Sequence, residues 1–153
     1  MYHYLLSIGS NVEPEKNILK SHYYIEILIG AIIEESSLYE SKAEGFESDF
    51  PFINQSVIVK SLLNPDEILL QISSIDESFK RSRSSNGYSD RTIDIDIILT
   101  DNKSPCKSAE VPHPRWKERN FVIVPSKELR TAVFSKELNQ VRLHINQTLK
   151  KYL

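Results

Sequence analysis

The chain has 153 residues, a mass of 17.7 kDa and a formal net charge of −2 at pH 7. That length predicts one domain over residues 1–153, and the 40% hydrophobic fraction excludes wholesale disorder. The charge balance argues against a protein that coats nucleic acid or an anionic membrane, and the single cysteine, Cys106, excludes an internal disulfide or a cysteine-based zinc site.

The first two predicted elements are a strand and a helix. Residues 4–8 are rich in β-forming side chains and end at a Gly-Ser-Asn turn signal, which predicts a short strand. Pro14 suits the first turn of a helix. Because Ile18, Ile25 and Ile29 follow at helical spacing, we expect an amphipathic helix there.

The next segment predicts two strands and a second helix. Residues 32–41 read as one strand of mixed polarity, and residues 52–62 place their branched apolar side chains on one face. Asn64 is a capping residue and Pro65 suits the first helical position, so a helix is expected to begin there. Its apolar side chains recur along one stripe: Ile68, Ile72, Ile75 and Phe79.

A polar loop then leads into residues 92–100, which alternate as a strand. The resulting order is β-α-β-β-α-β, the split motif of ferredoxin-like α+β folds. We expect a mainly antiparallel four-stranded sheet with both helices on one face. Residues 101–153 are expected to add short helices, with an extra hairpin as an option. This architecture hosts unrelated functions, so it leaves the chemistry open.

The sharpest chemical feature is Arg-Thr-Ile-Asp-Ile-Asp at 91–96. Asp94 and Asp96 are two apart on the expected strand, so they point the same way, with Cα atoms about 6.5 to 7 Å apart. Such a pair suits Mg²⁺, which takes one or two carboxylates plus phosphate oxygens. The alternative is a solvated strand face. Aspartate is disfavoured inside strands, so two of them need a reason, but this feature alone leaves both readings open.

Basic residues gather around this strand. Arg81, Arg83 and Arg91 all precede it, which places guanidinium groups beside carboxylates, as a nucleoside triphosphate site requires. His113 stands between two prolines in a second cationic segment and is a candidate phosphate ligand. The alternatives are that the arginines belong to a solvated loop and that the histidine is structural. Glycine-rich phosphate motifs are absent, so phosphate binding has to come from side chains and metal.

Together these motifs resemble the 6-hydroxymethyl-7,8-dihydropterin pyrophosphokinase family of folate biosynthesis. The resemblance runs nearly end to end and includes the segments 7–11, 52–57, 81–83, 91–97, 111–113 and 117–121. The Arg-Thr-x-Asp-x-Asp and Val-Pro-His elements are specific in combination and weak alone. The resemblance implies transfer of pyrophosphate from ATP to the pterin's hydroxymethyl oxygen, leaving AMP, with two Mg²⁺ ions as cofactor.

The resemblance also implies the site residues. Asp94 and Asp96 match the metal-holding carboxylates, and Arg81 and Arg91 match catalytic arginines of a mobile loop. The remaining expectations fall into an ATP-binding group, Asp76, Arg83, Ile97, His113 and Arg119, and a pterin-binding group, Ser41, Gly45, Phe52, Asn54 and Phe121.

The chain departs from the family pattern at several places. Asp76 stands for a usual glutamate, Tyr88 for a tryptophan, Asp90 for a proline and Pro114 for an aromatic residue, and residues 41–44 lack a Pro-rich turn. None of these removes a metal ligand or a principal arginine, so activity is expected. The alternatives are a relative that has lost catalysis and a ferredoxin-like module that binds RNA or another ligand. Two acids on the fourth strand would repel the phosphates of RNA, which argues against RNA binding.

The expected partners are therefore ATP and the pterin, without nucleic acid or membrane, and a monomer is expected. The N-terminus lacks the basic segment and apolar run of a signal peptide. The longest apolar run, 27–33, is far shorter than a bilayer span. These features predict a cytoplasmic protein.

Overall fold

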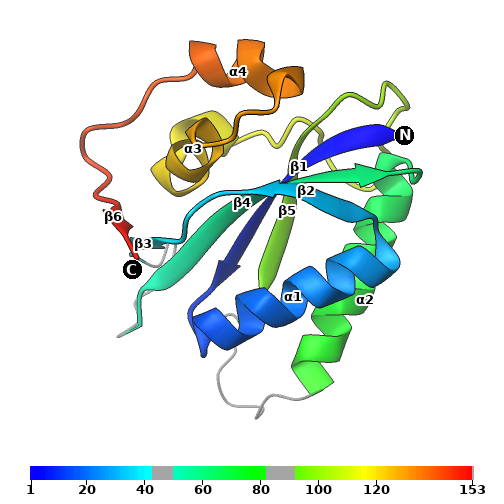
Figure 1. Ribbon diagram of the computed structural model, residues 1–153, viewed down its shortest axis with the longest axis horizontal. Coiled ribbons are helices and arrows are strands. Elements are labelled where there is room, and N and C mark those ends of the chain that lie inside the picture. Colours follow the sequence, from blue (N-terminus) through cyan, green and yellow to red (C-terminus); the bar gives the residue numbers. More distant parts are fainter. Residues whose placement is uncertain (43–49, 82–91, 153) are drawn as a thin grey trace.

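A computed structural model of the chain describes residues 1–42, 50–81 and 92–152, and in it one sheet lies between two helical layers (Figure 1). The strands are β1 (Tyr2–Ser10), β2 (Ala31–Glu35), β3 (Tyr39–Ser41), β4 (Phe52–Ser61), β5 (Asp94–Thr100) and β6 (Lys150–Lys151). The helices are α1 (Pro14–Leu28), α2 (Pro65–Arg81), α3 (Asn120–Lys127) and α4 (Ser135–Gln140), with 3-10 turns η1 (Trp116–Glu118) and η2 (Ala132–Phe134).

β1 and β4 form the centre of the sheet. β5 pairs with the edge of β1 that β4 does not occupy. Successive parts of β4 pair with β2 and β3, and β3 also pairs with β6. The pairings among these described strands are antiparallel. This arrangement is the split β-α-β-β-α-β motif, so the predicted ferredoxin-like α+β architecture is confirmed.

The single strand predicted over residues 32–41 is wrong, because that segment forms two strands. The chain leaves the ladder after β2, where Ser36 and Ser56 exchange hydrogen bonds. The Ser56 N–H donates to the Ser36 hydroxyl at 3.0 Å, so a side chain takes the place of a backbone carbonyl and the regular pairing is interrupted.

The optional C-terminal hairpin is also absent from the described residues 101–152. The last strand, β6, pairs with β3 near the start of the chain, and the Tyr152 N–H donates to Leu38 O at 2.9 Å. The edge of β3 offers unpaired backbone groups, so the chain end completes the sheet there instead of folding back on itself.

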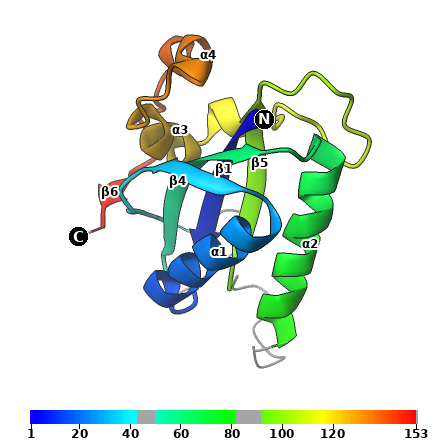
Figure 2. The same cartoon turned by 45° about the vertical axis from the view of Figure 1, so that its right-hand side comes forward.

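α1 and α2 cover one face of the sheet (Figure 2). The predicted helical stripes are buried there, including Ile18 and Ile25 of α1 and Ile75 of α2. Burying a side chain of this size stabilises the fold by about 1.5–3 kcal/mol. α2 begins with a reciprocal capping box, since the Asn64 N–H donates to Glu67 Oε1 and the Glu67 N–H donates to Asn64 Oδ1, each at 2.9 Å.

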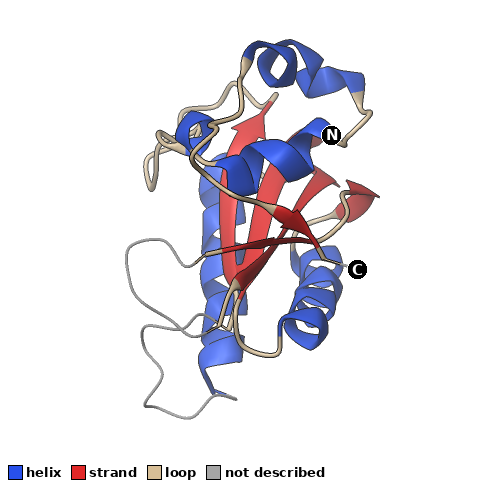
Figure 3. Ribbon diagram, turned by 90° about the vertical axis from the view of Figure 1, so that its left-hand side faces the viewer, coloured by secondary structure: helices blue, strands red, loops and turns tan. Residues whose placement is uncertain are grey.

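α3 and α4 lie on the opposite face (Figure 3) and cover one half of it. Leu5 of β1, Ile58 of β4 and Ile98 of β5 form a second core cluster with Trp116 and the buried side of α3. A register shift between Leu5 and Leu6 inserts an extra residue in β5, a bulge that bends this strand. Within the described residues, no helix is long and apolar enough to cross a bilayer.

Two glutamates join the α3 end to the sheet edge. Glu128 accepts hydrogen bonds from the Ser37 N–H at 2.9 Å and from the Tyr39 hydroxyl. Glu34 accepts the N–H groups of Arg130 and Thr131. Burial raises the pKa of each carboxyl, but these hydrogen bonds favour the charged form, outweigh burial and leave both pKa values below the ordinary one.

We expect Glu128→Gln to destabilise the fold by about 1 kcal/mol at pH 7, because a neutral amide accepts these hydrogen bonds more weakly than a carboxylate. A depressed carboxyl pKa stabilises the fold above the unfolded value, 4.5, and this contribution is lost as pH falls through the folded pKa. The difference from wild type in urea unfolding should therefore shrink below about pH 4.5. The exposed Glu26→Gln is the control. A difference independent of pH would contradict the assignment.

Candidate active site

The antiparallel register lines up the candidate residues across the half of the sheet that α3 and α4 leave open. Gly9 of β1 pairs with Asp94 of β5 on one side and with Asn54 of β4 on the other. Ser7 pairs with Asp96. Residues paired in this way point to the same face of a sheet. The two carboxylates and the Asn54 amide therefore lie on one face, separated by the glycine.

Asp94 is exposed and Asp96 is half-buried, whereas Ile93, Ile95 and Ile97 are buried toward α1 and α2. The predicted alternation along β5 is confirmed. Two aspartates supply hard oxygen donors, which fit Mg²⁺ because this ion completes its shell with water and phosphate oxygens. In the described part of the chain, this site included, no group of three or more His, Cys, Asp or Glu side chains lies together as a metal site.

Asn54 is buried on β4, and its side chain forms hydrogen bonds to residues of β3. Its Nδ2 donates to Ser41 Oγ at 2.7 Å and to Tyr39 O at 3.4 Å. Phe52 lies two residues earlier on the same face and is half-buried. A Cβ on Gly9 would lie 3.3 Å from Asn54 Oδ1 and 3.6 Å from the Phe52 ring, so the glycine keeps space between these side chains and the carboxylates.

The segment before α3 brings a cation onto an aromatic ring. Arg119 directly precedes α3, and its guanidinium carbon lies 5.5 Å from the centre of the Phe121 ring. This is cation–π geometry. Two residues predicted for different substrates, Arg119 for ATP and Phe121 for the pterin, are therefore in contact.

His113 is anchored next to β5. Its N–H donates to Ile98 O at 3.1 Å, and its Nδ1 accepts the Arg115 N–H at 3.1 Å. A neutral imidazole whose Nδ1 accepts a hydrogen bond carries its proton on Nε2. In that tautomer, the ring has a hydrogen-bond donor at Nε2, which is the group that a phosphate oxygen accepts from.

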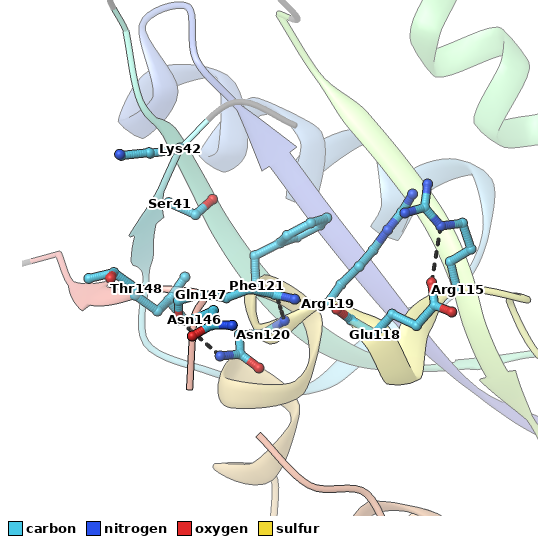
Figure 4. A pocket seen from close by; sticks show the side chains of 11 residues that line it. Ser41, Lys42, Arg115, Glu118, Arg119, Asn120, Phe121, Asn146, Gln147 and Thr148 are labelled. Atoms are coloured by element: carbon cyan, nitrogen blue, oxygen red, sulfur yellow. Dashed lines mark hydrogen bonds and ion pairs between the residues drawn. The ribbon is translucent and has the colours of Figure 1, made fainter. Parts of the chain in front are cut away.

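A cavity of about 380 Å³ opens beside Phe121 (Figure 4). Its walls come from the end of β3, from the segment spanning η1 and the start of α3, and from residues 146–149. Ser41, Arg119 and Phe121 were predicted as site residues. Arg115, Glu118 and residues 146–149 were not, because the sequence patterns assign them no role and only the fold brings them to the cavity.

Two residues predicted for ATP lie toward α2. Asp76 of α2 and Asp94 line a second cavity of about 140 Å³, and the Asp76 carboxylate pairs with Lys80 at 3.0 Å. Ile97 is 3% exposed in the core beneath α1 and α2. Its side chain faces away from the carboxylates, and its backbone pairs with Leu6 of β1 in the sheet.

Several sequence predictions fall outside the described residues. Arg81 ends α2, but its side chain is not described. The others are the predicted site residues Gly45, Arg83 and Arg91 and the departures Tyr88 and Asp90.

The chain matches known proteins over most of its length. The family model for 7,8-dihydro-6-hydroxymethylpterin-pyrophosphokinase matches residues 5–131. The 2-amino-4-hydroxy-6-hydroxymethyldihydropteridine pyrophosphokinase of Porphyromonas gingivalis is 37% identical over 125 residues, 78% of this chain and 85% of that protein. The Aquifex aeolicus protein of the same name is 36% identical over 130 residues, 84% of this chain and 80% of that protein.

Solved structures support the fold. A Plasmodium falciparum HPPK-DHPS structure superposes with a TM-score of 0.63 at 15% identity, covering 80% of this chain and 38% of that one. An HPPK-DHPS structure in complex with substrates gives a TM-score of 0.62 at 14% identity, covering 90% of this chain and 43% of that one. The chain thus spans less than half of these longer chains, and at such identities the likeness concerns the fold alone.

We expect Gly9→Val to destabilise the chain by about 1–3 kcal/mol, because the added methyl groups overpack the space beside Asn54 and Phe52. The Asn54 side-chain amide resonances should shift in the same variant. Gly9→Ala adds one carbon, so it should lose less stability and shift the Asn54 resonances less than Gly9→Val. Wild-type stability and unchanged Asn54 signals in Gly9→Val would contradict the close approach.

Proposed function

Because this chain belongs to the 7,8-dihydro-6-hydroxymethylpterin-pyrophosphokinase family, we propose that the open half of its sheet binds ATP beside β5 and the pterin beside β4. The chain is an ATP-dependent pyrophosphokinase of folate biosynthesis. It transfers pyrophosphate from ATP to hydroxymethyldihydropterin. The observation that carries the placement is the register of β5, β1 and β4, which puts both carboxylates and Asn54 on one face.

Asp94 and Asp96 are proposed to hold the Mg²⁺ that accompanies ATP, with two ions as the family resemblance implies. Their exposure supports this, since Asp94 is exposed and Asp96 is half-buried on the same strand. When bound, the metal neutralises phosphate charge. Asp76 belongs to the same region, because it shares a cavity with Asp94. Ile97 is assigned to the nucleotide on the sequence resemblance.

Cationic side chains are proposed to neutralise the rest of the triphosphate. His113 would donate from Nε2, and Arg119 would offer its guanidinium from the edge of the 380 Å³ cavity. Arg81, Arg83 and Arg91 are assigned to the triphosphate on the sequence resemblance. Phosphoryl transfer needs positioning and charge neutralisation more than covalent chemistry, so this set of groups suffices without a nucleophilic side chain.

The pterin is proposed to lie between Phe52 and Phe121, with Asn54 at its polar edge. Asn54 is held in place by Ser41, and Phe121 by its contact with Arg119, so both are positioned before substrate arrives. Gly45 is assigned to the same pocket on the sequence resemblance. The Arg119–Phe121 contact would bring the ring-binding side chain next to a phosphate-binding one.

We also propose that residues 1–153 act as one domain and as a monomer in the cytoplasm, without nucleic acid or membrane partners. Both core clusters form on the two faces of one shared sheet, which supports a single folding unit. The charge balance of the sequence supports the absence of polyanionic partners.

The direct test is incubation of the purified chain with ATP, Mg²⁺ and 6-hydroxymethyl-7,8-dihydropterin, followed by separation of the nucleotides. We expect AMP, formed only when the pterin is present. Asp96→Asn should abolish AMP formation while the protein stays folded, because a loss of metal-held charge removes stabilisation from the transition state. Glu110→Gln, an exposed acid outside the site, is the matched control and should retain the wild-type rate.

Other products would reject parts of the proposal. ADP together with a monophosphorylated pterin would reject pyrophosphoryl transfer. ATP binding without any turnover would favour a relative that has lost catalysis. Wild-type rates in Asp96→Asn at saturating Mg²⁺ would indicate that the two aspartates belong to a solvated strand face and hold no metal.

A further inference from the structure

The chain after α4 runs along the 380 Å³ cavity and supplies one of its walls. Residues 146–149 line the cavity, although the family model ends at residue 131. We refer to residues 144–152 as the C-terminal strap. This wall therefore comes from a part of the chain that the family match does not cover.

One end of the strap is fastened to the start of α3 by Asn120, which is buried. Its Nδ2 donates to His144 O at 2.6 Å and to Gln147 O at 2.9 Å, and its Oδ1 accepts the His144 N–H at 2.8 Å. The Gln147 side chain makes two further hydrogen bonds, because its Oε1 accepts the Asn120 N–H and its Nε2 donates to Glu118 O. Breaking these bonds would leave the buried Asn120 side chain without its partners, which is costly.

The other end is fastened to β3. β6 pairs with β3, the Tyr152 N–H donates to Leu38 O at 2.9 Å, and the Tyr152 hydroxyl donates to Glu15 Oε1 at 2.6 Å. β3 ends in Ser41, which lines the cavity too. Because both ends are held, the residues between them form a fixed wall.

The strap lies at one end of the cavity. Figure 4 shows Thr148 on the side of Ser41 and Lys42, whereas Arg115 and Glu118 lie on the other side of Phe121. The strap thus lies at the end of the cavity that holds Ser41, whose hydroxyl accepts a hydrogen bond from Asn54, and away from Arg115. Phe52 and Asn54 do not line this cavity themselves. Thr148 is exposed, so its hydroxyl is accessible to a ligand.

We propose that the C-terminal strap is a specificity-determining wall of the pterin pocket and that Thr148 contacts the bound pterin. This rests on the proposed function. The edge of a pterin ring carries both donors and acceptors, and a threonine hydroxyl can serve either. A wall held at both ends limits the size of ring substituents that fit, because it yields little when a larger ligand enters.

The test is Thr148→Trp, which fills the end of the cavity beside Ser41. We expect the KM for the pterin to rise about tenfold or more, with kcat at saturating pterin and the KM for ATP nearly unchanged. The calorimetric Kd for the pterin should rise in parallel. The matched control is Ile145→Trp, on the same strap but 98% exposed and absent from the cavity wall, which should behave as wild type.

Thr148→Val keeps the shape of the side chain and removes the hydroxyl, so it tests the contact even if the tryptophan variant fails to fold. We expect a rise of about threefold in the KM for the pterin. Wild-type KM in Thr148→Val, or equal KM in the two tryptophan variants, would overturn the strap proposal while wild-type turnover upholds the proposed function. Absence of pterin binding by the wild-type chain would overturn both.

Discussion

The register of β1 between β5 and β4 is the constraint on which the rest of the site depends. It sets Asp94 and Asn54 on either side of Gly9, on the face away from α1 and α2. A slip of one residue in β5 would turn both aspartates toward the isoleucine core, where unpaired carboxylates are strongly disfavoured. The packing of the isoleucines thus fixes the direction of the carboxylates, so the stability of this strand and the metal binding proposed for it depend on the same register.

The division of the outer face into a covered and an open half follows from the same strands. At the covered half, Leu5, Ile58 and Ile98 are apolar and pack beneath α3. At the open half, β1 carries the small residues Gly9 and Ser7 at the corresponding positions. α3 forms the boundary, and Arg119 and Phe121 at its start belong to the site. One short helix therefore closes the core, and the helix and the residue before it supply two of the side chains proposed to bind substrates.

The sequence predicted what local patterns encode. The helical stripes of α1 and α2, the Asn64 cap and the facing of Asp94 and Asp96 all follow from periods of 3.6 and 2 within a few residues. The break at Ser36 was missed because it depends on a hydrogen bond to Ser56, 20 residues away. The strap was missed for the same reason, since Asn120 binds a segment 24 to 27 residues later that carries no motif.

The most direct measurement of the central claim is paramagnetic broadening by Mn²⁺ in place of Mg²⁺, with a non-hydrolysable ATP analogue. The account predicts that the amide signals of Ser7, Gly9, Asp94 and Asp96 broaden and that those of the outer side of α1, such as Leu19, remain sharp. It also predicts that Asp96→Asn removes the effect. Broadening centred on α1, or unchanged in Asp96→Asn, would contradict a metal–nucleotide site on the open half of the sheet.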